Sequence, residues 1–293
     1  MKRAVILINA YSRLKSSLNQ SQRLKAELEK RGVKTDILPN DFFAAAIEGN
    51  GIVSRLSGYD FCVYIDKDKY ISHMLERAGM RLFNSADAIE KCDDKMTTFI
   101  ELSGHKIPMP KTLPGLLCYD EGEPVKKSAL DIAERELGYP MIVKACYGSL
   151  GKGVYKADGR AELEGICAQL KCQPHLFQKY ISESRGRDMR VIVVGGRCVA
   201  AMVRSSDSDF RSNIELGGHG TAIDPPEEIK DIVLRAAAAL GLDYCGADVL
   251  FGKDGYLLCE VNSNAFFGGI ESVTKVNVGG LYADHMCRQI YGK

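Results

Sequence analysis

The first ninety residues alternate short apolar runs with amphipathic segments. The apolar run at residues 4–8 has the length of a buried strand, and Leu18, Leu24 and Leu28 then recur at helical spacing. Further strands are predicted over residues 33–38, 60–65 and 81–83, with helical segments between them. Strands that alternate with helices predict a small parallel sheet, which we assign to a first domain, residues 1–92.

Two prolines change this pattern after a short helix predicted over residues 97–102. Pro108 and Pro110 forbid the continuation of a helix, and the next segment combines amphipathic helices with apolar strands. The predicted elements are helices at residues 130–137 and 159–170 and strands at residues 141–145 and 175–181. We assign them to a second domain, residues 93–183.

The remaining residues, 184–293, form a third predicted domain in which strands pair as hairpins. Gly195 and Gly196 interrupt an apolar stretch and suit a two-residue hairpin turn. The predicted elements are strands at residues 186–194, 197–204, 244–251 and 256–262 and helices at residues 225–240 and 279–291. The pattern therefore predicts an α/β (α+β) protein, in which antiparallel sheets follow a small parallel sheet.

Charge and cysteine usage narrow the class of protein. The 39 lysines and arginines balance 38 acidic residues without blocks of like charge, which argues against a nucleic-acid partner. The ten cysteines include no C-x-x-C pair, and several lie inside apolar runs, as expected of reduced thiols. The apolar run at the N-terminus is too short for a signal sequence, and no stretch reaches membrane-spanning length. We therefore expect a cytoplasmic protein without a membrane partner.

The last predicted hairpin carries oxygen ligands on both strands. Glu260 and Asn262 should share one face, and Cys259 should point to the other. A loop centred on Asp254 would place Asp248 opposite Glu260, with their Cβ atoms about 5 Å apart. Two carboxylates and an amide oxygen at one point predict a magnesium site. The alternative is a set of solvated polar residues on the outer face of an amphipathic hairpin.

A glycine-rich loop, residues 147–153, follows the strand predicted at residues 141–145. Its three glycines and one serine leave backbone N–H groups free to approach phosphate oxygens closely. The order of the glycines matches neither a dinucleotide-binding loop nor a Walker A loop, and a tight turn without a ligand is the alternative. Lys144 favours a phosphate site, because a lysine inside an apolar strand is costly unless it meets an anion.

Taken in order from Lys95 to Glu271, these motifs resemble those of the ATP-grasp ligases, and most of all the RimK-type branch, which joins an amino acid to a carboxylate. The individual motifs are moderately specific, whereas their order is highly specific. The resemblance implies an ATP-grasp fold, in which a central lid and a C-terminal antiparallel-sheet subdomain hold ATP between them.

The resemblance also implies roles for individual residues. The nucleotide site would comprise Lys95, Lys144, Gly148, Ser149, Gly151, Gln178, Lys179, Tyr180, Ile181, Asp188, Arg211 and Asn213. Within that set the lysines and the loop would hold the phosphates, and Arg211 and Asn213 would lie at the phosphate and metal end. Residues 178–181 would hold the adenine, and Asp188 the ribose. The metal ligands for Mg²⁺, or Mn²⁺, would be Asp248, Glu260 and Asn262. Arg190, Arg204 and Lys144 would be catalytic, with the arginines facing the acyl-phosphate and the substrate carboxylates.

Two departures from the family pattern concern recognition. Lys179 stands where the adenine strand usually has an acidic residue, which a contact made by the backbone tolerates. Residues 263–269, Ser-Asn-Ala-Phe-Phe-Gly-Gly, differ from the usual segment beside the amino-acid pocket, so the sequence leaves the amine unidentified.

The implied activity is that of an ATP- and Mg-dependent carboxylate-amine ligase, which forms an amide through an acyl-phosphate and releases ADP and phosphate. Glutamate is the first candidate for the amine, and the acceptor carboxylate belongs to a small molecule or a protein C-terminus. The oligomeric state stays open, and a homo-oligomer is one option. A kinase is disfavoured because the chain has no H-R-D motif. A non-catalytic nucleotide sensor or scaffold with the same fold is the alternative.

Overall fold

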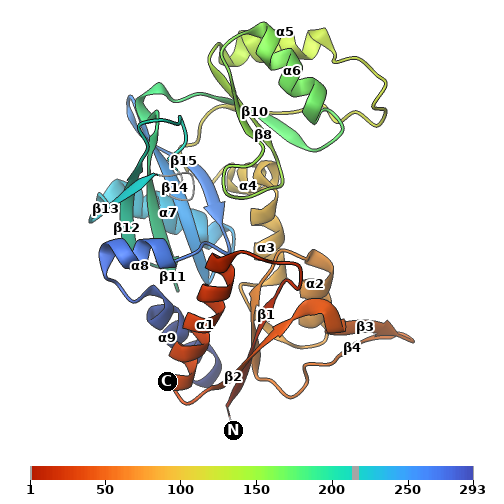
Figure 1. Cartoon of the computed structure of the whole chain (residues 1–293), viewed down its shortest axis with the longest axis vertical. Helices are drawn as coiled ribbons and strands as arrows, with labels where there is room; N and C mark the ends of the chain where they lie inside the picture. The colour runs from red at the N-terminus through yellow and green to blue at the C-terminus, as the bar shows by residue number, and fades with distance from the viewer. Residues whose placement is uncertain (1, 213–217, 293) are drawn as a thin grey trace.

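The computed structural model describes residues 2–212 and 218–292 (Figure 1). Its N-terminal sheet is parallel, with the strand order β2-β1-β5-β6. The elements are β1 (Arg3–Ile8), α1 (Lys15–Lys30), β2 (Lys34–Pro39), β5 (Phe61–Ile65), α2 (Lys69–Arg77), β6 (Arg81–Phe83) and α3 (Ala86–Asp93). Every residue of β5 is buried, because α1 covers one face of the sheet and α2 and α3 cover the other.

A separate antiparallel hairpin, β3 (Ala45–Glu48) and β4 (Gly51–Ser54), projects from this part of the molecule (Figure 1). The sequence analysis did not predict it. The apolar run at residues 42–47 overlaps β3 but was not assigned to a strand, and Ile47 in β3 is 73% exposed. The two-residue turn between the strands is Gly49-Asn50, with a φ of 57° at Gly49, and this residue pair is a local signal for a hairpin.

The second sheet is antiparallel, with the order β7-β10-β8-β9, and α5 and α6 pack on one of its faces (Figure 1). The elements are α4 (Lys95–Leu102), β7 (Thr112–Pro114), α5 (Lys127–Leu137), β8 (Met141–Ala145), β9 (Val154–Ala157), α6 (Arg160–Leu170) and β10 (His175–Lys179). Strand β10 ends two residues earlier than predicted, so Tyr180 and Ile181 follow it. The buried side chains of this sheet and of its two helices form a core of their own.

The third sheet is antiparallel, with the order β13-β12-β11-β14-β15. The strands are β11 (Arg187–Val194), β12 (Arg197–Ser205), β13 (His219–Ala222), β14 (Tyr244–Gly252) and β15 (Gly255–Asn262), and the helices are α7 (Glu227–Ala239), α8 (Gly268–Thr274) and α9 (Val278–Tyr291). Gly195 and Gly196 form the predicted tight turn, with φ angles of 53° and 72°. Alternate residues of β11 face opposite sides of the sheet: Val191 and Val193 pack with α7, and Ile192 and Val194 with α8 and α9.

Strand β15 contains a β-bulge that the sequence analysis missed. Gly252 lies opposite Gly255, and a regular ladder from that turn would set Asp248 opposite Cys259. The register shifts by one residue, so Asp248 pairs with Glu260 as predicted, with Cys259 as the extra residue. The expectation that Cys259 points away from Glu260 was therefore wrong. Both residues line the same cavity, because the bulge interrupts the strict alternation of the strand.

One hydrophobic core joins the first sheet to the third. It contains Ile6 of β1, Leu24 of α1, Ile192 of β11 and Tyr282 of α9, among other buried side chains. At its edge the Arg31 Nε donates to Asp284 Oδ1 over 2.6 Å, which ties α1 to α9. In the residues that the structure describes, no helix is long and apolar enough to cross a bilayer.

Candidate active site

A cavity of about 780 Å³ lies between the second sheet, the third sheet and helix α1. One end is partly apolar and is lined by Ile142, Val154, Met202 and Leu250. The four residues predicted for adenine recognition, Gln178, Lys179, Tyr180 and Ile181, line the cavity as well. The Gln178 amide donates to Thr112 Oγ1 over 2.9 Å, which fixes this buried side chain against β7. This end of the cavity suits a flat heterocycle, with apolar faces and polar edges.

The two predicted phosphate-binding lysines are buried at the cavity wall. Lys95 is 8% exposed and Lys144 is 7% exposed. The Lys95 Nζ donates to the Gly148 carbonyl over 2.9 Å and lies 3.7 Å from Glu260 Oε1. The Lys144 Nζ lies 3.6 Å from Cys259 Sγ, and within the described residues it forms no salt bridge. A buried ammonium without a carboxylate partner is costly, so this position favours an anionic ligand.

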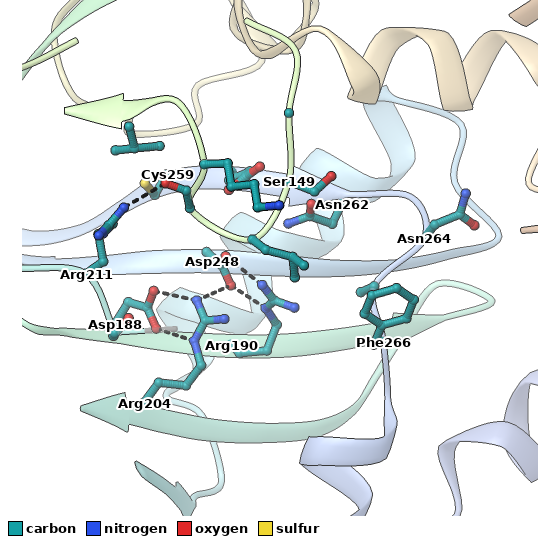
Figure 2. A pocket seen from close by; sticks show the side chains of 18 of the residues that line it. Ser149, Asp188, Arg190, Arg204, Arg211, Asp248, Cys259, Asn262, Asn264 and Phe266 are labelled. Atoms are coloured by element: carbon teal, nitrogen blue, oxygen red, sulfur yellow. Dashed lines mark hydrogen bonds and ion pairs between the residues drawn. The ribbon is translucent and has the colours of Figure 1, made fainter. Parts of the chain in front are cut away.

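The glycine-rich loop is held over the cavity by three cations. Besides Lys95, the Arg211 guanidinium donates to the Gly151 carbonyl over 2.8 Å, and Lys67 Nζ donates to Ser149 Oγ over 3.3 Å (Figure 2 shows Arg211 and Ser149). Gly151 has a φ of 72°, a conformation that favours glycine. The sequence analysis missed Lys67, because the residue gains its role only when the end of β5 meets the loop.

A network of two aspartates and two arginines crosses β12, β11 and β14 (Figure 2). Arg204 donates to both oxygens of Asp188, over 2.7 and 2.6 Å, and lies 3.0 Å from Asp248 Oδ1. Arg190 forms a bidentate pair with the same Asp248. The two predicted catalytic arginines therefore lie close together, because both contact Asp248, and each pairs with a carboxylate of the third sheet.

The two aspartates of this network differ in pKa. Burial raises the pKa of Asp188, and the attraction of Arg204 does not outweigh that effect. Burial also acts on Asp248, yet Arg190 and Arg204 together hold the pKa of Asp248 below its ordinary value. For the same reason the pKa of Arg204 is raised despite its burial, because two carboxylates stabilise its charged form.

The predicted metal ligands Asp248, Glu260 and Asn262 line one wall of the cavity. They offer two carboxylates and one amide, which is the hard oxygen donor set that Mg²⁺ takes together with water and phosphate. The two arginines occupy three of the roughly four lone-pair sites of Asp248, which leaves this carboxylate a site for a cation. The donor chemistry therefore fits Mg²⁺. Asn213, the other residue predicted for this end, lies outside the described residues.

Part of the same cavity is lined by residues from the first 92 positions and by the segment after Asn262; this part, here called the N-terminal lobe, was not found by sequence reasoning. Its polar lining includes Asn9, Ser17, Gln20, Asp66 and Asn264. The Asn264 amide donates to the Asp66 backbone carbonyl over 2.9 Å, and Asn9 and Asn40 donate to the Asp66 carboxylate. Burial raises the pKa of Asp66. Phe266 also lines the lobe (Figure 2).

The chain belongs to the RimK-like ATP-grasp family, because the domain model of that family matches residues 92–286. Among solved structures, D-alanine–D-alanine ligase from Bacillus anthracis in complex with ATP matches with a TM-score of 0.74 at 16% identity, covering 100% of this chain and 97% of that one. The predicted fold class, an α/β ATP-grasp architecture, is therefore confirmed.

Two curated relatives illustrate the family in sequence. Human N-acetylaspartylglutamate synthase A is 39% identical over 226 residues, which are 76% of this chain and 56% of that protein. A probable alpha-L-glutamate ligase of Rhodopirellula baltica is 33% identical over 286 residues, which are 92% of this chain and 68% of the relative. The chain thus spans little more than half the length of the human enzyme.

Proposed function

We propose that this protein is an ATP- and Mg-dependent carboxylate-amine ligase that adds glutamate to an acceptor carboxylate. The observation that carries the proposal is the pair of buried lysines, Lys95 and Lys144, facing the carboxylates of β14 and β15 across one cavity. Cations for phosphate and oxygen ligands for a metal therefore line the same space. The family's fold supports the use of ATP, and the names of both relatives support glutamate as the amine.

The proposed reaction has two steps. An oxygen of the acceptor carboxylate attacks the γ-phosphorus of ATP, the bond to the β,γ-bridging oxygen breaks, and ADP leaves. The amine nitrogen then attacks the carbon of the acyl-phosphate, the C–O bond to phosphate breaks, and the amine gives up a proton. The products are an amide, ADP and phosphate. Mg²⁺ bound at Asp248, Glu260 and Asn262 would neutralise phosphate charge during this transfer.

The side chains of the cavity suit chemistry of this kind, which depends on positioning and on charge neutralisation. Lys95 and Lys144 are placed to bind phosphate oxygens beneath the glycine-rich loop. Arg190 and Arg204 are held rigidly by Asp248 and Asp188, so they can present fixed positive charge to a carboxylate or an acyl-phosphate. No histidine occurs among the described residues that line the cavity, which fits a mechanism without an imidazole base.

The test is ADP release with Mg-ATP, L-glutamate and a panel of acceptor carboxylates that includes N-acetylaspartate and citrate, with product masses recorded. ADP that depends on both substrates and yields an amide mass supports the ligase. Glu260→Gln should abolish turnover, whereas Glu228→Gln, the same change on the exposed face of α7, should leave it intact. Nucleotide binding without ADP formation on any acceptor would favour a sensor or scaffold instead. Full activity of Glu260→Gln at low Mg²⁺ would remove Glu260 from the metal site.

A further inference from the structure

The start of helix α1 forms one wall of the N-terminal lobe. It lacks the side-chain cap and the acidic residues that usually stabilise the N-terminus of a helix. Leu14 is the N-cap and makes no side-chain cap, and the first turn contains no acidic residue. The first turn instead begins with Lys15, so the positive end of the helix dipole is reinforced. The first N–H groups of a helix have no acceptor within the helix. This end therefore favours an anion.

Two buried side chains of the same helix present hydrogen-bond donors to the lobe. Ser17 is 6% exposed and Gln20 is 5% exposed, and both line the cavity. Gln20 Oε1 accepts a hydrogen bond from the Phe267 backbone N–H over 3.1 Å. This contact identifies the oxygen of the side-chain amide, and Nε2 is therefore its hydrogen-bond donor. Within the described residues, neither that Nε2 nor the Ser17 hydroxyl has a hydrogen-bond partner. Both residues line the cavity, so a ligand there can accept hydrogen bonds from these two donors.

The lobe is part of the same cavity as the predicted metal ligands. Phe267, which Gln20 holds, lies five positions after the predicted metal ligand Asn262, and Asn264 between them also lines the cavity. A substrate that reaches from the arginine pair into the lobe would therefore bring a second functional group to α1. The donors there are an uncapped helix end, a hydroxyl and a primary amide, which together match a carboxylate.

We propose that the N-terminal lobe binds a carboxylate group that is not the one activated, and that Ser17 and Gln20 are its specificity-determining residues. The inference rests on the proposed ligase function. Two sources share this chemistry: a carboxylate of the incoming amino acid, and a second carboxylate of the acceptor. The kinetic constants of the two substrates distinguish them.

The test uses two variants and two matched controls in the full chain. Gln20→Glu keeps an oxygen for the Phe267 N–H and replaces the donor with a second negative oxygen. Ser17→Ala removes one hydroxyl at a helical position where alanine is well tolerated. The controls are Gln22→Glu, the same charge change on the exposed face of α1, and Ser21→Ala, a buried serine whose hydroxyl donates to the Leu18 carbonyl.

We expect Gln20→Glu to raise the KM of one carboxylate substrate by about ten- to a hundredfold, and Ser17→Ala by about tenfold. The KM for ATP should stay within twofold of wild type, and so should every constant of the two controls. A rise in the KM for L-glutamate identifies the amino acid as the source, and a rise for the acceptor identifies the acceptor. Unchanged KM values for both substrates in Gln20→Glu and Ser17→Ala would overturn the proposal.

A failure of the ligase function has a different signature, because wild-type protein would then form no amide with any pair of substrates. In that case calorimetry with L-glutamate, N-acetylaspartate and citrate, in the presence of Mg-ADP, replaces kinetics. Binding to wild type that Gln20→Glu weakens at least tenfold would support the carboxylate site. Absence of binding, or equal binding to wild type and to Gln20→Glu, would overturn it.

Discussion

Replacement of Arg204 by methionine tests the network of aspartates and arginines, because Arg204 is the residue that joins its two halves. Arg204 is 4% exposed, and it is the one cation that the structure's described residues place on Asp188. Asp248 keeps Arg190 when Arg204 is lost, but Asp188, at 9% exposed, keeps no positive partner. The variant therefore leaves an uncompensated carboxylate in the interior.

Removal of one partner of a buried ion pair costs about 3–5 kcal/mol of unfolding free energy. We expect a loss of that size for Arg204→Met at pH 7. The loss should shrink as the pH falls, because the pKa of Asp188 is already raised by burial and rises further without Arg204. A group whose folded-state pKa is raised binds a proton more readily when folded, so the folded state regains stability as Asp188 becomes protonated.

Urea denaturation at pH 5 and pH 8 measures both effects. The double variant Arg204→Met/Asp188→Asn should recover about 2 kcal/mol relative to Arg204→Met alone, because the buried charge is gone. The same variants, assayed for ADP release, separate stability from catalysis, since the double variant should fold well and still lack turnover. Strictly additive stability effects, or an Arg204→Met protein as stable as wild type at pH 8, would refute this account of the network.

Two further substitutions test the phosphate site and the junction of α1 with α9. Lys144→Met should weaken Mg-ATP binding by about ten- to a hundredfold, as measured by calorimetry. Its melting temperature should stay equal or rise, because a buried unpaired charge is lost. A lower melting temperature would contradict this second expectation. Hydrogen bonds from Lys30 and Arg31 lower the pKa of Glu27 to about 2. The stability that Glu27 provides is present above its ordinary pKa and should be lost as the pH falls toward 2. Glu27→Gln should therefore lower the free energy of unfolding by about 2 kcal/mol at pH 7. In urea titrations at pH 3 and 7, the variant's free energy of unfolding should change less with pH than that of the wild type.

The sequence predicted those parts of the structure that depend on local patterns. The two adjacent glycines at 195 and 196 require positive φ angles, and they mark the observed turn. The pairing of Asp248 with Glu260 was also predicted, although from a symmetric loop, whereas the chain combines a shorter turn with a bulge. A bulge adds one residue without a composition signal of its own, which is why the orientation of Cys259 was missed.

The N-terminal lobe could not be predicted, because its contacts are distant in sequence. Gln20 and Phe267 are 247 positions apart, and nothing in the pattern around either residue shows that they meet. Ser17 and Gln20 sit in an ordinary amphipathic helix, where a buried polar residue is visible only after the helix has been placed. The glycine-rich loop, Lys144 and the pair of Asp248 and Glu260 were visible as local patterns, and the resemblance supplied their common arrangement.

The hydrophobic core shared by β1, α1, β11 and α9 determines which pieces of this chain can exist alone. A cut after residue 92 would separate Ile6 and Leu24 from Ile192 and Tyr282, and would expose the apolar faces of both fragments. The second sheet is different, because its strands and helices enclose a core drawn from residues 113–177. In exchanges of parts between related chains, the second sheet with α5 and α6 should therefore be transplanted by itself, and the first and third sheets should be moved together.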